Sequence, residues 1–140
     1  EGIAGTGKTS TAGVIARQLF GASIRSNYME LNSSDERGID VVRDKIKTFA
    51  KISPFNSTFK VILLDESDEM TAESQNALRR IMEKYADITI FIFCVNSVEK
   101  LISPIRSRCE VFHFGPISVH DITERLADIA CAEKGIAEAY

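Results

Sequence analysis

Short apolar segments along the chain predict its strands. Residues 28–31, 61–64 and 88–95 are rich in aliphatic and aromatic side chains, and a shorter segment of the same kind lies at residues 111–114. The segment at 61–64 is apolar at every position, which is typical of a parallel strand covered on both faces. We therefore expect a sheet of buried strands, with residues 88–95 as a second buried member.

Between these segments, apolar residues recur at the spacing of a helix. A helix is predicted over residues 8–20, where Gly21 ends it. Thr71 is expected to cap a later helix. Alternating strands and helices predict an α/β fold, a parallel sheet with flanking helices, whose ligands lie at the carboxyl ends of the strands. The apolar faces of two helices are formed by Ile39, Val42, Ile46 and Phe49, and by Leu78, Ile81, Met82 and Tyr85.

A glycine-rich motif at residues 2–9 carries the clearest chemistry. It has the form G-x-x-x-x-G-K-[ST], a P-loop whose backbone N–H groups surround phosphate oxygens at a helix N-terminus. Lys8 is expected to reach the β and γ phosphates of ATP, and Thr9 to offer its hydroxyl to Mg²⁺. An ordinary glycine-rich turn is the alternative, but few turns match all the fixed positions by chance. The predicted nucleotide-binding residues are Gly2, Ile3, Ala4, Gly5, Thr6, Gly7, Lys8, Thr9 and Ser10.

Two acidic residues directly follow the buried segment at 61–64. Asp65 stands where P-loop ATPases hold Mg²⁺, and Glu66 stands beside it, where a free carboxylate deprotonates the attacking water. The pair therefore predicts hydrolysis as well as binding. Asp68 and Glu69 are interpreted as a solvated acidic turn ahead of the helix capped by Thr71.

Two polar residues further along are weaker candidates. Asn96 ends the segment at 88–95 and should lie next to Asp65 and Glu66, where a neutral amide can hold the water or a γ-phosphate oxygen. The alternative is an asparagine that only ends a strand. Arg108 lies between a helical turn and the segment at 111–114, a position typical of a surface arginine.

Composition narrows the class of protein. A chain of 140 residues with 44% hydrophobic and 26% charged residues is typical of a globular domain. No apolar run approaches the roughly 20 residues that span a bilayer, so we expect no membrane partner and an intracellular protein. The three cysteines form no C-x-x-C pair, which favours reduced, structural thiols. The net charge of −3 means that any contact with nucleic acid must come from a local basic patch.

Several longer motifs resemble the small subunit of replication factor C, an AAA+ sliding-clamp loader. The likeness runs along nearly the whole chain, and most of its motifs are far more specific than the P-loop. They are Gly5-Thr6-Gly7-Lys8-Thr9, Glu30-Leu31-Asn32, Ser34-Asp35-Glu36-Arg37-Gly38-Ile39, Leu64-Asp65-Glu66-Ser67-Asp68, Gln75-Asn76-Ala77-Leu78-Arg79-Arg80 and Ser107-Arg108-Cys109.

The resemblance implies a function and roles for two residues. Asn96 falls at the family's sensor-1 position, and Arg108 at the arginine finger that enters the ATP site of a neighbouring subunit. The implied activity is ATP hydrolysis within a hetero-pentameric ring that opens a sliding clamp and loads it onto primer–template DNA. The implied location is the cytoplasm of an archaeal host, which is favoured, or the nucleus of a eukaryotic one.

The resemblance also implies a contact with DNA. Helices at this place in the family line a spiral that follows the duplex backbone, so Arg43 and Lys47, four residues apart on one polar helix face, are candidate phosphate contacts. The alternative is that Arg43 pairs with Asp40, and Lys47 with Asp44, as surface salt bridges.

Departures from the family concern the ends of the chain. Ile3-Ala4 and Ser67 differ from the usual residues without removing a functional group. We expect an ATPase core at residues 1–115, lacking the strand before the P-loop, and the first helix of a lid domain at 116–140, where Ser118 and Asp121 form a capping box and the helix ends near Gly135. The rival functions are a non-hydrolysing scaffold subunit of the same ring and another AAA+ ATPase that remodels DNA.

Overall fold

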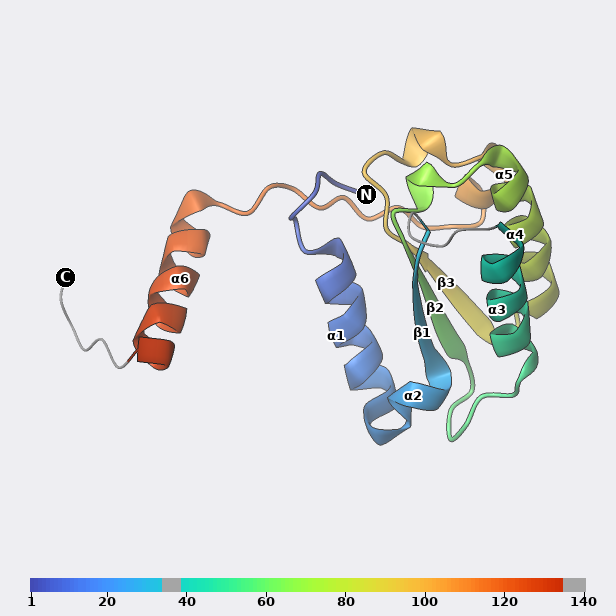
Figure 1. The fold of residues 1–140 in the computed structure, drawn as a ribbon, viewed down its shortest axis with the longest axis horizontal. Coiled ribbons are helices and arrows are strands. Elements are labelled where there is room, and N and C mark those ends of the chain that lie inside the picture. Colours follow the sequence, from blue (N-terminus) through green and yellow to red (C-terminus); the bar gives the residue numbers. More distant parts are fainter. Residues whose placement is uncertain (34–38, 135–140) are drawn as a thin grey trace.

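The computed structural model describes residues 1–33 and 39–134, with the side chains of 39–42, 133 and 134 also outside the description. The described residues form a three-stranded sheet. Helices lie on both sides of it (Figure 1). The elements are α1 (Lys8–Phe20), α2 (Ile24–Asn27), β1 (Tyr28–Asn32), α3 (Ile39–Lys51), β2 (Lys60–Asp65), α4 (Ala72–Tyr85), β3 (Thr89–Phe93), α5 (Ser103–Arg106) and α6 (Val119–Lys134), with short 3-10 turns at Gly21–Ser23, Ser67–Glu69 and Val98–Lys100.

The strands form one parallel sheet in the order β1-β2-β3. Asn32 at the end of β1 lies opposite Asp65 at the end of β2, and Leu64 lies opposite Phe93 of β3. All three carboxyl ends therefore meet at one edge of the sheet. The predicted α/β fold with a parallel sheet is confirmed.

Strand β2 is buried on both faces, as its apolar run predicts. Ile62 and Leu64 pack into a core with residues of α3 and α4, whereas Val61 and Leu63 pack against residues of α1. In Figure 1, α1 covers one face of the sheet and α3 and α4 cover the other. All four of these strand residues are at most 2% exposed. Their close packing fixes the position of Asp65, the last residue of β2.

The predicted helix caps are present. The Ser74 N–H donates to Thr71 Oγ1 at 3.2 Å ahead of α4, and the Asp121 N–H donates to Ser118 Oγ at 3.1 Å ahead of α6. Helix α6 lies apart from the sheet (Figure 1), and its apolar positions, including Leu126, are exposed. The division of the chain near residue 115 stays a prediction. None of the described helices is long and apolar enough to cross a membrane.

Two strand predictions need correction. Residues 111–114 are not a strand, because the backbone hydrogen bonds of the described chain join them only to Glu1. Its ammonium group donates to Phe112 O at 2.6 Å, and its carbonyl accepts from Phe114 N at 2.7 Å. Two hydrogen bonds to a single residue do not form the ladder of a β-sheet. Strand β3 is also less buried than expected, with Ile90 46% exposed, and within the described residues it lies at the edge of the sheet, where β2 is its neighbour.

Candidate nucleotide-binding site

The P-loop leads directly into α1. Gly5 and Gly7 have φ angles of 79° and 87°, which glycine adopts without a steric penalty. No side chain caps α1, and its first turn contains no acidic residue. The N–H groups of that first turn have no carbonyl partner within the helix, so they are available to an anion at the positive end of the helix dipole.

Lys8 joins the loop to the end of the sheet. Its ammonium group donates to Gly2 O at 2.6 Å, to Ile3 O at 2.9 Å and to Asn96 Oδ1 at 3.4 Å. These acceptors are neutral, so none of them cancels the charge of Lys8. The contact also places Asn96, 88 positions away in the sequence, beside the loop, whereas its position next to Asp65 and Glu66 stays a prediction.

Thr9 and Asp65 meet across the same edge. The Thr9 hydroxyl donates to Asp65 Oδ2 at 2.8 Å, although the residues are 56 positions apart. Both side chains are half-buried. A hydroxyl and a carboxylate are the oxygen ligands that Mg²⁺ prefers, so the residues predicted to hold this ion lie together.

Glu66 lies at a sharp turn after β2. Its backbone is left-handed, with φ 51° and ψ 38°, and its N–H donates to Asp65 Oδ1 at 2.9 Å. A non-glycine residue in this conformation costs about 1–3 kcal/mol, and such residues occur often at functional sites. The turn leaves the Glu66 side chain exposed, beside Asp65 in sequence. We call Lys8, Thr9, Asp65, Glu66 and Asn96 the rim.

Backbone contacts behind the rim connect the ends of β2 and β3. The Ser67 N–H donates to Cys94 O at 3.1 Å, and Gly2 N donates to Val95 O at 3.2 Å. Burial raises the pKa of the Cys94 thiol, and the negative charge of Asp65 raises this pKa further. The thiol is therefore protonated and unreactive, as expected for a structural cysteine, and all three cysteines are free.

The interpretation of Asp68 as part of a solvated turn is wrong. Its side chain is 0% exposed and lies 3.2 Å from the ammonium group of Lys100, whereas Glu69 is exposed as expected. Sequence reasoning also missed Lys100, because the two residues are far apart in the chain and nothing in the local pattern at Asp68 or at Lys100 relates them.

Arg108 makes its described contacts outside the rim. It follows α5, which Figure 1 shows beside α4, on the side of the sheet opposite α1. Its guanidinium group donates to Pro104 O at 2.6 Å and pairs with Glu83 at 2.7 Å. The side chain is 43% exposed, so part of it faces solvent.

The two candidate DNA contacts lie on α3. Arg43 and Lys47 are both exposed. The side chain of Asp40, the alternative partner of Arg43, lies outside the described residues. Among the described side chains no ion pair joins Lys47 to Asp44, its alternative partner.

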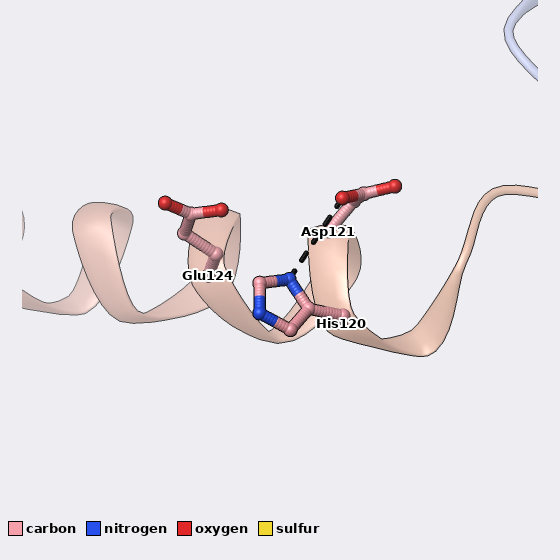
Figure 2. A group of neighbouring side chains, drawn as sticks. All are labelled: His120, Asp121 and Glu124. Carbon is pink, nitrogen blue, oxygen red and sulfur yellow. Dashed lines mark ion pairs between the residues drawn. The ribbon is translucent and has the colours of Figure 1, made fainter.

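A further group of polar side chains lies on the first turns of α6. His120, Asp121 and Glu124 have donor atoms within 4.8 Å of one another, and all three are exposed. Figure 2 shows them on one side of the helix, with His120 Nδ1 3.9 Å from Asp121 Oδ1. The capping bond from Ser118 to Asp121 accounts for part of this arrangement, and no described residue of the rim takes part in it.

Comparisons with known proteins bear on the family. A sequence model described as DNA polymerase III, delta subunit matches residues 29–118. The replication factor C small subunit of Methanococcus maripaludis (strain C5) is 53% identical over 131 residues, 93% of this chain and 42% of that protein. The corresponding protein of Archaeoglobus fulgidus is 51% identical over 137 residues, 97% of this chain and 43% of that protein.

A solved structure gives an independent view of the fold. The DNA polymerase III gamma subunit-related protein of Thermotoga maritima aligns with a TM-score of 0.55 and 22% identity, over 74% of this chain and 34% of that chain. At this identity the likeness shows the fold alone. This chain spans about two fifths of the length of the curated relatives. The resemblance seen in the motifs is confirmed, and the chain belongs to the clamp-loader-type family described as DNA polymerase III, delta subunit, with replication factor C small subunits among its relatives.

Proposed function

We propose that this chain is the nucleotide-binding part of a clamp-loader subunit that binds ATP with Mg²⁺ and hydrolyses it. The observation that carries the proposal is the meeting of loop and strand ends at the rim, through Thr9–Asp65 at 2.8 Å and Lys8–Asn96 at 3.4 Å. These contacts join three distant segments at the carboxyl edge of a parallel sheet, the usual place for a ligand in such folds.

Each rim residue has a role that follows from its chemistry. Lys8 offers a charge that none of its described acceptors neutralises, which favours the phosphates of ATP. Thr9 and Asp65 would hold Mg²⁺, which when bound neutralises charge on the phosphate oxygens. Glu66, turned out of the sheet by its backbone, accepts a proton from the attacking water at its carboxylate. The Asn96 amide orients that water or a phosphate oxygen without adding charge.

The proposed setting is a ring of clamp-loader subunits that loads a sliding clamp onto primer–template DNA. The family and the replication factor C relatives support it. In this setting Arg108, whose described partners lie outside its own rim, acts on the ATP of a neighbouring subunit.

The test is the variant Glu66→Gln in the complete, assembled protein. We expect ATP binding to persist and single-turnover hydrolysis to fall by roughly 10²-fold or more, the scale of a lost general base. The matched control is Lys8→Ala, which should lose binding instead. An unchanged hydrolysis rate in Glu66→Gln would show that Glu66 is not the base that deprotonates the attacking water.

A further inference from the structure

The carboxylate of Asp68 is buried directly behind the rim. Asp68 lies in the 3-10 turn Ser67–Glu69, which directly follows Glu66. Its side chain is 0% exposed. Within the described part of the chain neither carboxylate oxygen accepts a hydrogen bond of good geometry. A buried carboxylate without a counter-charge is strongly unfavourable, so the close approach of the Lys100 cation matters.

Lys100 comes from the loop that carries Asn96. Its ammonium group lies 3.2 Å from Asp68 Oδ2 and 3.1 Å from Glu69 Oε1. The hydrogen bond to Glu69 raises the pKa of Lys100, and the interaction with Asp68 raises it further, so the group stays charged at neutral pH. The lysine thus bridges two segments that contribute different residues to the rim.

Lys100 links the loop after β3 to the turn that follows Glu66, whereas the other attachments of the loop lead elsewhere: the Val98 N–H donates to Glu1 Oε2 at 2.7 Å, and Leu101 is buried in the core. β3 ends at Phe93, and residues 96–101 form no strand. Gln75 of α4 holds the far end of the loop, donating to Lys100 O at 3.2 Å and accepting from Ile102 N at 2.8 Å. At the near end, the Asn96 amide is exposed and accepts from Lys8 at 3.4 Å. Between these ends, the side chain of Lys100 ties the loop to the turn that begins at Glu66.

We propose that Lys100 is a positioning residue for hydrolysis, whose contact with buried Asp68 fixes the Asn96 loop relative to the Glu66 turn. This inference rests on the proposed function, since it assigns Glu66 and Asn96 to the same reacting water. A displacement of about 1 Å between groups that orient a reactant costs on the order of 10²-fold in rate. Within the described residues, the hydrogen bonds and ion pairs of Lys100 are with Asp68, Glu69, Gln75 and Ser97, none of which belongs to the rim. We therefore expect its effect to fall on the hydrolysis step and to spare nucleotide affinity.

The experiment compares four variants of the complete, assembled protein: Lys100→Met, Asp68→Asn, the double variant Asp68→Asn/Lys100→Met, and Lys100→Arg. ATP affinity and single-turnover hydrolysis are measured separately. We expect Lys100→Met to lower the hydrolysis rate roughly tenfold or more with ATP affinity unchanged, and Lys100→Arg to recover most of the rate. Lys84→Met, which removes an exposed lysine of α4, should match the wild type.

The double variant gives a decisive result even where Lys100→Met alone fails to fold. It removes both charges together and leaves no unpaired buried carboxylate. Because the two residues act as one unit, the double variant should lose no more rate than the more impaired single variant. A double variant with the wild-type rate would overturn the proposal, and so would equal losses of affinity and rate that Lys100→Arg does not recover.

Lys8→Ala and Glu66→Gln together distinguish failure of the proposed function from failure of the Lys100 role. If Lys8→Ala keeps the ATP affinity and Glu66→Gln keeps the hydrolysis rate of the wild type, the proposed function itself fails. If Glu66→Gln is impaired while Lys100→Met and the double variant keep the wild-type rate, only the positioning role of Lys100 fails.

Discussion

The rim and the outward-facing basic residues differ in where their partners lie. Lys8, Thr9, Asp65 and Asn96 contact one another across the sheet edge, whereas Arg108 pairs with Glu83 on the surface of its own domain. Arg43 and Lys47 are exposed on α3. The fold of a single chain therefore brings together the residues that we propose for binding and hydrolysis, while the basic residues require another molecule for their proposed roles.

The largest expected effect tests whether Arg108 acts on another chain. In the assembled ring, Arg108→Ala should lower hydrolysis by roughly 10³-fold at the interface to which it contributes, the lower end of the effect of an arginine finger. Mixing Arg108→Ala subunits with Lys8→Ala subunits should restore activity only at interfaces that combine an intact loop with an intact Arg108. The measurement is a mixing titration of ATPase activity. Absence of rescue at every ratio would mean that Arg108 acts within its own chain, or not at all, and the contrast with the rim would disappear.

A smaller effect tests the basic face of α3. Replacing Arg43 and Lys47 by alanine should weaken primer–template binding equally for all sequences, because bonds to phosphate carry no base information. The slope of log K against log salt should fall in magnitude by roughly 0.9 for each phosphate group that a variant subunit no longer binds. The control is Arg125→Ala on α6, an exposed arginine 3.9 Å from Asp128. An unchanged slope in the double variant would mean that Arg43 and Lys47 bind no DNA phosphate and are only solvated charges on the helix surface.

The smallest expected effect concerns the resting contact of Arg108. The side chains of Arg108 and Glu83 are 43% and 39% exposed, and ion pairs at such exposure contribute about 0–1 kcal/mol. Glu83→Gln should therefore change the free energy of unfolding by less than about 1 kcal/mol in a denaturant titration. Glu99→Gln, which breaks the exposed pair with Arg106, is the matched control. Glu83 also lies 3.9 Å from Arg79. Only a loss in Glu83→Gln much larger than the loss in Arg79→Gln would therefore mean that Arg108 is tied to its own domain and is not available to a neighbour.

Much of the site can be predicted because its residues follow local features of the chain. The P-loop glycines need left-handed backbone, and the apolar run at 61–64 needs burial, so Lys8 and Asp65 are located by their immediate neighbours in sequence. A parallel arrangement brings the ends of β2 and β3 to one edge, which is why Asn96 is expected near Asp65 from the order of the strands alone.

The incorrect predictions have a common physical cause. In each case, the structure of the segment is decided by residues far away in the sequence. Residues 111–114 have the composition of a strand but no adjacent ladder in the described chain, and β3 has the composition of a central strand but pairs along one edge. Asp68 looks like a turn residue in its local context, yet Lys100 covers it from another loop.

Residue type and spacing over a few positions are enough to indicate the α/β class, the P-loop, the acidic pair after the buried strand and the family, because each of these is a local property of the chain. Three contacts could be learned only from the folded molecule: Thr9 with Asp65, Lys8 with Asn96, and buried Asp68 with Lys100. Such contacts depend on which distant segments pack together, and the free energy that selects one packing is shared among many residues of the core.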